Sequence, residues 1–157
     1  MFDVLPDDMQ AKGLSAVGRL DRDTTGILLF TTDGELAHRL ISPNRNVDKV
    51  YLAEVDSPLD DKCVRMMAEG VRLKDFTAKP AVMTVISPFC AELTVTEGKY
   101  HQVKRMFAAL GRNVVKLKRL SVAGVSLDPE LELGMSRRLY DGEIERLYKA
   151  VGLENAK

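Results

Sequence analysis

The sequence has few of the residues that build disulfide frameworks, metal centres or membrane spans. Its only two cysteines, Cys63 and Cys90, lie in apolar segments and lack the spacing of metal ligands, so we expect buried thiols, no disulfide and no zinc site. No apolar run approaches 18 residues, which leaves membrane spanning without support. A charged-then-apolar leader, repeats and low-complexity tracts are also missing, and we therefore expect a cytoplasmic location.

Motifs that bind common cofactors are missing as well. The sequence contains no glycine-rich phosphate loop, no dinucleotide fingerprint and no histidine or cysteine cluster at metal spacing. The two histidines, His38 and His101, fall on predicted helices without a serine or cysteine placed for a triad. We interpret them as structural or RNA-facing residues. Any chemistry is therefore expected to need neither a cofactor nor a metal.

Composition predicts one compact domain with a segregated charge distribution. At 157 residues with 45% hydrophobic content, the chain is long enough for one core and short for two. Net charge is zero, yet residues 98–127 hold seven basic residues and no acid, whereas residues 1–97 hold 16 acidic and 11 basic residues. Such a basic stripe is typical of a surface that contacts phosphates. A solvated basic face is the alternative that composition leaves open.

Hydrophobic periodicity predicts at least six strands and four helices. The strands are expected at 27–32, 47–55, 71–73, 81–86, 91–96 and, as one or two strands, 114–125; the helices are expected from Thr32, from Asp60 or Asp61 to Gly70, at 101–110 and from Asp141. Lys49 and Tyr51 share one face of their strand by its two-residue period. Several neighbouring strands resemble hairpins and no strand-helix-strand repeat occurs, which favours an α+β fold with a largely antiparallel sheet.

The loop 18–26 carries the most informative carboxylate, that of Asp21. It runs directly into the apolar segment 27–30, and loops supported by buried structure carry chemistry more often than other surface does. The alternating polar residues from Asp21 onward resemble the first half of a calcium loop, but Thr32 stands where that loop needs a glutamate. From the residues alone, Asp21 is either a reactive group or a turn residue paired with neighbouring arginines.

Three separated motifs resemble those of one enzyme family, the pseudouridine synthases, and in particular the RsuA group that modifies ribosomal RNA. The motifs are the loop 18–26, Lys49-Val50-Tyr51 and the segment 97–106. Segments 77–81 and 115–119 extend the similarity to nearly the whole chain. The resemblance implies the pseudouridine synthase fold, in which helices flank a mixed and mostly antiparallel sheet.

The resemblance also implies roles for three residues. Asp21 matches the nucleophile that attacks the target uridine, so that the C–N bond breaks, the base turns and a C–C bond forms; attack on the base and attack on the sugar both remain open. Tyr51 matches a tyrosine that packs on the uracil face and helps to move a proton. Lys104 falls where many relatives have an arginine paired with the catalytic aspartate, and we expect it to keep Asp21 ionised.

The other residues that the resemblance selects are expected to bind RNA. Extruding a nucleotide from structured RNA costs on the order of a few kcal/mol, which basic residues can offset through phosphate contacts, and Leu117 matches an apolar residue of the uracil pocket. The expected substrate-binding residues are Arg19, Leu20, Arg22, Thr24, Lys49, Lys99, His101, Gln102, Arg105, Leu117 and Arg119.

The sequence departs from the family at its start. Family members usually carry an S4 RNA-binding domain and then a first strand with a Lys-Pro-x-Gly motif, and neither occurs here. We expect residues 1–157 to form an N-terminally incomplete catalytic domain, monomeric, with the missing segment supplied in the full-length protein. The expected function is isomerisation of a uridine in 16S (small-subunit) ribosomal RNA or a pre-ribosomal particle, without a membrane or a small-molecule cofactor. The alternatives are a large-subunit target and a non-catalytic RNA-binding or ribosome-assembly module.

Overall fold

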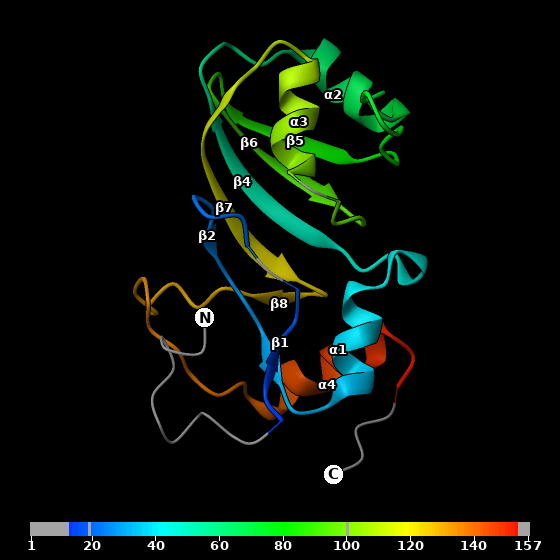
Figure 1. The fold of residues 1–157 in the computed structure, drawn as a ribbon. Helices are drawn as coiled ribbons and strands as arrows, with labels where there is room; N and C mark the ends of the chain where they lie inside the picture. The colour runs from blue at the N-terminus through cyan, green and yellow to red at the C-terminus, as the bar shows by residue number, and fades with distance from the viewer. Residues whose placement is uncertain (1–12, 19, 100, 154–157) are drawn as a thin grey trace.

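The chain forms two halves (Figure 1), which are connected by the two longest strands, β4 (Lys49–Val55) and β7 (Val114–Val122). The computed structural model describes residues 13–18, 20–99 and 101–153. Its strands are β1 (Ser15–Ala16), β2 (Thr25–Gly26), β3 (Phe30–Thr31), β4 (Lys49–Val55), β5 (Val82–Ser87), β6 (Cys90–Val95), β7 (Val114–Val122) and β8 (Val125–Ser126); its helices are α1 (Gly34–Ile41), α2 (Asp61–Glu69), α3 (Gln102–Ala109) and α4 (Asp141–Ala150), with a 3-10 turn at Pro43–Arg45. In Figure 1, α2 and α3 lie with β5 and β6 in one half, and α1 and α4 lie with β1 and β8 in the other.

The main sheet has the strand order β2-β7-β4-β6-β5, and β8 pairs with the end of β7. β1 and β3 form a separate antiparallel pair. Every pairing between these strands is antiparallel except that of β2 with β7. The expected α+β class with a largely antiparallel sheet is therefore confirmed.

Gly26 decides how β2 joins the sheet. Its φ is +119°, and a Cβ atom there would lie 2.2 Å from the carbonyl oxygen of Arg119, so only glycine suits both the backbone conformation and the close approach. The next residue, Ile27, donates its N–H to that carbonyl at 3.0 Å. The expected continuous strand at 27–32 is wrong because the chain leaves the main sheet after Gly26 and becomes a strand again only at β3.

Asp33 both starts α1 and connects it to α4. Its Oδ1 accepts hydrogen bonds from the backbone N–H groups of Glu35 and Leu36, each at 3.1 Å, which makes Asp33 the N-cap rather than Thr32 as expected. Its Oδ2 accepts a hydrogen bond from the Tyr148 hydroxyl at 2.6 Å. This hydrogen bond raises the pKa of Tyr148 to about 12.

The other helices begin and end close to the expected positions. Asp60 caps α2, and Gly111 follows α3 with a left-handed φ of +77°. One detail was wrong: the expected strand at 71–73 is a single bridge between Arg72 and Thr77. Among the described residues, no helix combines the length and apolar character needed to cross a membrane.

Two apolar cores hold the halves together, one in each. The first packs Met67 of α2 and Phe107 of α3 with apolar side chains of β4, β5 and β6. The second packs Leu40 of α1 and Val151 beyond α4 with Val125 of β8. Burial of these apolar side chains is the main favourable contribution to folding. Because the cores are separate, a surface that carries both polar and apolar side chains lies between them.

The two cysteines are free thiols. Cys63 is fully buried in the first core, as expected, whereas Cys90 at the start of β6 is only half-buried. Burial raises the pKa of the Cys90 thiol, with the nearby carboxylates of Glu54 and Glu92 as the smaller causes.

Candidate active site

A pocket of about 330 Å³ lies between the two cores. Its walls come from the loop 17–24, from β4 and β7, and from the segment 97–103. The volume falls within the range of about 300–1,000 Å³ that is usual for small-ligand sites. The expected site residues that line it are Leu20, Asp21, Thr24, Lys49, Tyr51, Lys99, Gln102, Leu117 and Arg119.

The other five expected residues are not among those that line the pocket. Lys104 and His101 contact the carboxylates of the loop at its rim, and Arg22 is exposed on the same loop. Arg105 forms an ion pair with Asp75 on the segment after α2. Arg19 lies outside the described residues.

The loop presents two carboxylates to the start of α3. Oδ1 of Asp21 lies 3.7 Å from Nε2 of His101, and Oδ1 of Asp23 forms an ion pair with Nζ of Lys104. The hydrogen bond from Lys104 lowers the pKa of Asp23. The expected pairing of Lys104 with Asp21 is therefore corrected: Lys104, one helical turn beyond His101, reaches the second carboxylate of the loop.

His101 adopts a backbone conformation that is uncommon for a non-glycine residue. Its φ is +48°, in the left-handed region, and it immediately precedes α3. Such conformations cost on the order of 1–3 kcal/mol and concentrate at functional sites. The sequence assigned His101 only a structural or RNA-facing role, because no pattern indicated that the turn before α3 would bring its imidazole to Asp21.

Two buried cations form the opposite wall of the pocket. Lys49 on β4 is 9% exposed and Arg119 on β7 is 5% exposed. Nε and Nη2 of Arg119 both donate hydrogen bonds to the carbonyl oxygen of Ile27, at 2.9 and 2.7 Å. Burial lowers the pKa of Lys49, and the positive charge of Arg119 lowers it further.

Tyr51 and Leu117 supply the flat and apolar part of the pocket. The pairing of β4 with β7 shifts register between Val50 and Tyr51, so that Tyr51 lies opposite Arg119. A bulge of this kind re-aims side chains and is common beside active sites. An aromatic ring, an apolar side chain and a carboxylate in one pocket suit a planar heterocycle attached to a sugar.

Glu97 is the pocket residue that the sequence reasoning did not select. It is 5% exposed, and its carboxylate accepts hydrogen bonds from the backbone N–H of Lys79 at 2.8 Å and from Nε2 of Gln102 at 3.0 Å. Oε1 of Gln102 accepts a hydrogen bond from the backbone N–H of Lys99 at 3.2 Å. Glu97 and Gln102 thus hold the segments at Lys79 and Lys99 around the pocket. The signal for Glu97 in the sequence was its place at the start of the motif 97–106.

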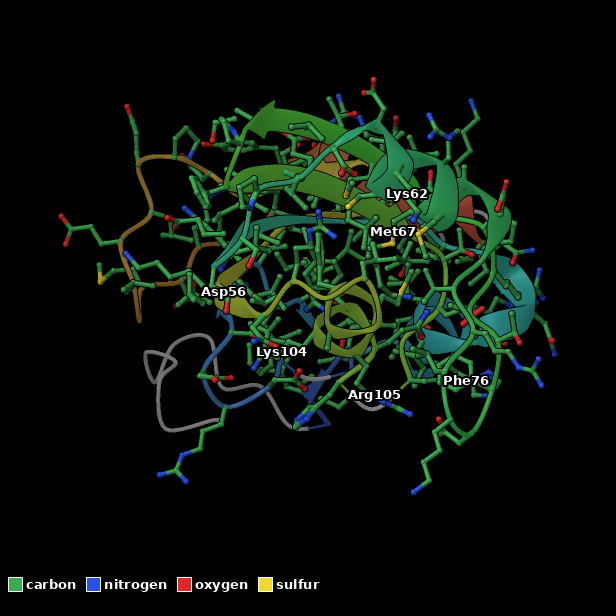
Figure 2. The ribbon with its side chains drawn as sticks, turned by 90° about the horizontal axis from the view of Figure 1, so that it is seen from above. Asp56, Lys62, Met67, Phe76, Lys104 and Arg105 are labelled. Atoms are coloured by element: carbon green, nitrogen blue, oxygen red, sulfur yellow. The ribbon has the colours of Figure 1, made fainter. Side chains whose placement is uncertain are left out.

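A second pair of cations, Lys99 and Arg105, packs on the Phe76 ring beside the pocket. Nζ of Lys99 lies 4.2 Å from the centre of the Phe76 ring, and Cζ of Arg105 lies 5.5 Å from it. Figure 2 shows Lys104, Arg105 and Phe76 on one side of the molecule, apart from Lys62 on α2. The positive charge at the rim is therefore held in place by an aromatic ring and by the Asp75 carboxylate.

The fold and this pocket agree with one family. A family model described as RNA pseudouridylate synthase matches residues 4–109, and a solved structure described as "Crystal structure of pseudouridylate synthase" superposes with a TM-score of 0.88 at 41% identity, covering 93% of this chain and 64% of that one. The chain belongs to the RNA pseudouridylate synthase family.

More specific similarity comes from bacterial relatives named "Ribosomal small subunit pseudouridine synthase A". The protein of Escherichia coli (strain K12) is 48% identical over 141 residues, which are 88% of this chain and 61% of that protein. The protein of Vibrio vulnificus (strain CMCP6) is 44% identical over 151 residues, 93% of this chain and 64% of that protein. The chain thus spans about three fifths of the length of these relatives.

Proposed function

We propose that this chain carries the catalytic site of an enzyme that isomerises a uridine to pseudouridine in small-subunit ribosomal RNA. The observation that carries the proposal is a single loop carboxylate, Asp21, in a pocket with Tyr51 and Leu117, in a chain of the RNA pseudouridylate synthase family. The names of the bacterial relatives support the small-subunit substrate. A ribosomal RNA substrate agrees with the expected cytoplasmic location.

The reaction proposed for this pocket rearranges one nucleotide and consumes no second substrate. Asp21 attacks the uridine, the bond from C1′ of the ribose to N1 of uracil breaks, the base turns, and a bond forms from C1′ to C5. The hydrogen on C5 is lost as a proton while N1 gains one, so the product is an isomer. In this proposal Tyr51 packs on the turning base, and its hydroxyl helps with proton transfer.

The base must leave the RNA stack to reach this pocket, at a cost on the order of a few kcal/mol. The cations beside the pocket supply contacts with the RNA backbone that offset this cost. Lys99 and Arg105 pack on the face of the Phe76 ring. Arg22 is exposed on the loop 18–26. The proposal therefore places the RNA strand across the rim, with the target base in the pocket.

The deciding experiment compares the two carboxylates of one loop. The wild-type chain, Asp21→Asn and Asp23→Asn are incubated with 16S ribosomal RNA transcript, and pseudouridine is counted by nucleoside chromatography. We expect Asp21→Asn to lose activity by a factor on the order of 10⁴ or more, as for a removed nucleophile, while the matched Asp23→Asn variant retains most of it.

Each other outcome has a defined meaning. Unchanged activity of Asp21→Asn would remove the nucleophile assignment. A wild-type chain that forms no pseudouridine, but binds the RNA with a steep salt dependence, would instead identify a non-catalytic RNA-binding module. Product in large-subunit RNA alone would redirect the substrate assignment.

A further inference from the structure

Two buried cations of the pocket, Lys49 and Arg119, lie as deep as the Glu97 carboxylate and form no ion pair with a carboxylate of the described residues. Lys49 and Arg119 are 9% and 5% exposed, whereas 28% of the Asp21 side chain is exposed. Neither cation forms an ion pair with a carboxylate anywhere in the described part of the chain. The cations therefore line the inner wall of the pocket, and Asp21 lies nearer its mouth.

This arrangement is costly unless the cations have a functional role. Buried charges are normally paired, because each loses the hydration that stabilised it in water. Glu97, a buried acid of the pocket lining, accepts hydrogen bonds from the Lys79 backbone and from Gln102, and the Arg119 guanidinium donates to a neutral carbonyl. Burial and repulsion by Arg119 lower the pKa of Lys49 and outweigh the opposing attraction of Asp48. A negative charge that enters this space would therefore be stabilised by both cations.

The depth of the two cations indicates which part of the substrate they meet. In a flipped nucleotide the base enters the pocket, while the phosphates stay with the RNA strand at the rim. We propose that Lys49 and Arg119 form an anion subsite that stabilises negative charge on the uracil ring during the reaction. This inference rests on the proposed function and adds a catalytic subsite to it.

Negative charge must move from Asp21 to uracil whichever atom is attacked. In attack at C1′, an oxygen of Asp21 bonds to C1′, and the C1′–N1 bond breaks with its electron pair on uracil, where the carbonyl oxygens share the charge. In attack at C6, the oxygen bonds to C6 and the C5–C6 π pair moves to the C4 carbonyl oxygen. When the C1′–C5 bond has formed and the ester opens, the charge returns to Asp21.

Fixed cations at the inner wall favour the charged form of the base more than the neutral substrate. Interactions that strengthen only as charge develops lower the barrier without tightening substrate binding. Because neither cation forms an ion pair with a carboxylate of the described residues, both remain available to a negative charge on uracil. This gives the subsite a signature that differs from that of a phosphate contact, which would act mainly on RNA affinity.

The test uses Lys49→Met, with Lys62→Met on α2 as the matched control. Single-turnover rate and RNA dissociation constant are measured on 16S transcript. We expect Lys49→Met to lower the rate on the order of 100-fold, to leave RNA affinity unchanged, and to leave Tm unchanged or raise it, because an unpaired buried charge is removed. Weaker RNA binding at an unchanged rate would identify a phosphate contact and overturn the proposal.

A second substrate separates a chemical role from a structural one. Replacing the target by 5-fluorouridine makes the leaving uracil a more stable anion, because fluorine withdraws electrons, so the rate lost in Lys49→Met should be smaller with this substrate. The rate is that of loss of the starting nucleoside. An equal loss with both substrates would overturn the subsite. If the wild-type chain converts no uridine, the proposed function itself fails; if it converts uridine as fast as Lys49→Met does, only the subsite fails.

Discussion

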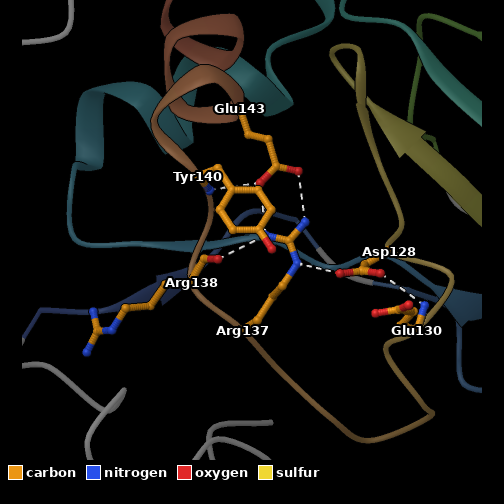
Figure 3. Close-up of polar contacts among 6 residues, drawn as sticks. All are labelled: Asp128, Glu130, Arg137, Arg138, Tyr140 and Glu143. Atoms are coloured by element: carbon orange, nitrogen blue, oxygen red, sulfur yellow. Dashed lines mark hydrogen bonds and ion pairs between the residues drawn. The ribbon is translucent and has the colours of Figure 1, made fainter.

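Two arginines in different regions of the molecule differ in the groups that accept their hydrogen bonds. Arg119 donates to a neutral carbonyl, whereas Arg137 donates to carboxylates. Arg119 in the pocket is 5% exposed, and its guanidinium donates two hydrogen bonds to one backbone carbonyl, that of Ile27. Arg137, in the segment before α4, donates to Asp128 at 3.0 Å and to both oxygens of Glu143 at 2.9 Å. Its guanidinium also stacks 4.5 Å from the centre of the Tyr140 ring (Figure 3).

This difference in partners distinguishes a charge with a structural role, that of Arg137, from a charge available to a ligand, that of Arg119. The hydrogen bonds to Arg137 lower the pKa of Glu143 to about 2 and raise that of Arg137, so each group stabilises the charged form of the other. The protein supplies every counter-charge in that cluster. In the pocket it leaves two cations without acidic partners in the described chain, although such partners would favour folding. The two cations are therefore available to a negatively charged group of a bound ligand.

Gly26→Ala gives the largest expected effect, because it disturbs the backbone that places Arg119. A methyl group there would meet the Arg119 carbonyl at 2.2 Å, at a φ of +119°. We expect the free energy of unfolding to fall by about 3 kcal/mol or more, measured by urea denaturation. The control is Gly34→Ala on α1, where nothing lies within 4 Å and a gain of up to about 1 kcal/mol is expected. Equal stability of the two variants would contradict the role given to Gly26.

Arg137→Met tests the structural side of the comparison. It leaves the carboxylates of Asp128 and Glu143 partly buried without their cation, and we expect a loss of about 2 kcal/mol in the free energy of unfolding at pH 7. The single-turnover rate of the folded protein should stay unchanged. A large fall in that rate would show that the Arg137 cluster serves the site, and the comparison would fail.

The same cluster predicts an acid-sensitive contribution to stability. The Glu143 carboxyl has a lower pKa in the folded protein, about 2 against an ordinary 4.5, so the folded state binds fewer protons in that range. Its contribution is complete above about pH 4.5 and is lost as the pH falls to about 2. We expect it to be about 1–2 kcal/mol because the pair is partly exposed.

Glu143→Gln isolates this contribution from that of the other carboxylates. Denaturant unfolding of the wild type and the variant is followed between pH 7 and pH 2. The difference between the two curves should shrink toward low pH. A constant difference would mean that the Glu143 charge does not contribute.

The smallest effects are expected at the loop carboxylate that pairs with Lys104. The Asp23 side chain is 78% exposed, and exposed ion pairs contribute little to stability, so Asp23→Asn and Lys104→Met should leave Tm unchanged. We expect Lys104→Met to lower the single-turnover rate more than Asp23→Asn does, because it removes a positive charge beside the loop that carries Asp21. Equal rates in the two variants would confine Lys104 to its contact with Asp23.

Much of the fold was predictable because its signals are local. The strands near 47–55, 81–86 and 91–96 follow a two-residue period, and the helix at 101–110 shows an apolar stripe with a glycine after it. The strand expected at 27–32 was wrong because Gly26 must approach the Arg119 backbone, a contact with a residue 93 positions later. No local pattern reports such a contact.

The candidate site divides in the same way. Asp21, Tyr51, Lys49 and Leu117 could be selected because each lies in a short motif with a recognisable pattern, and the pocket brings them together. The ion-pair partner of each charged side chain could not be predicted from the sequence. Whether Lys104 meets Asp21 or Asp23 depends on how α3 lies against the loop, which no local pattern in the sequence reports.

The amino-acid sequence by itself therefore determined the family, the secondary structure of its periodic segments and the residue types available for chemistry. Only the tertiary structure decided which charges neutralise one another and which remain unpaired. The reason is physical: periodicity and capping act over a few neighbouring residues, whereas the energy of a charge depends on its burial and on every group within several ångströms. Arg119 and Arg137 are chemically identical in the sequence and acquire different roles only through their surroundings.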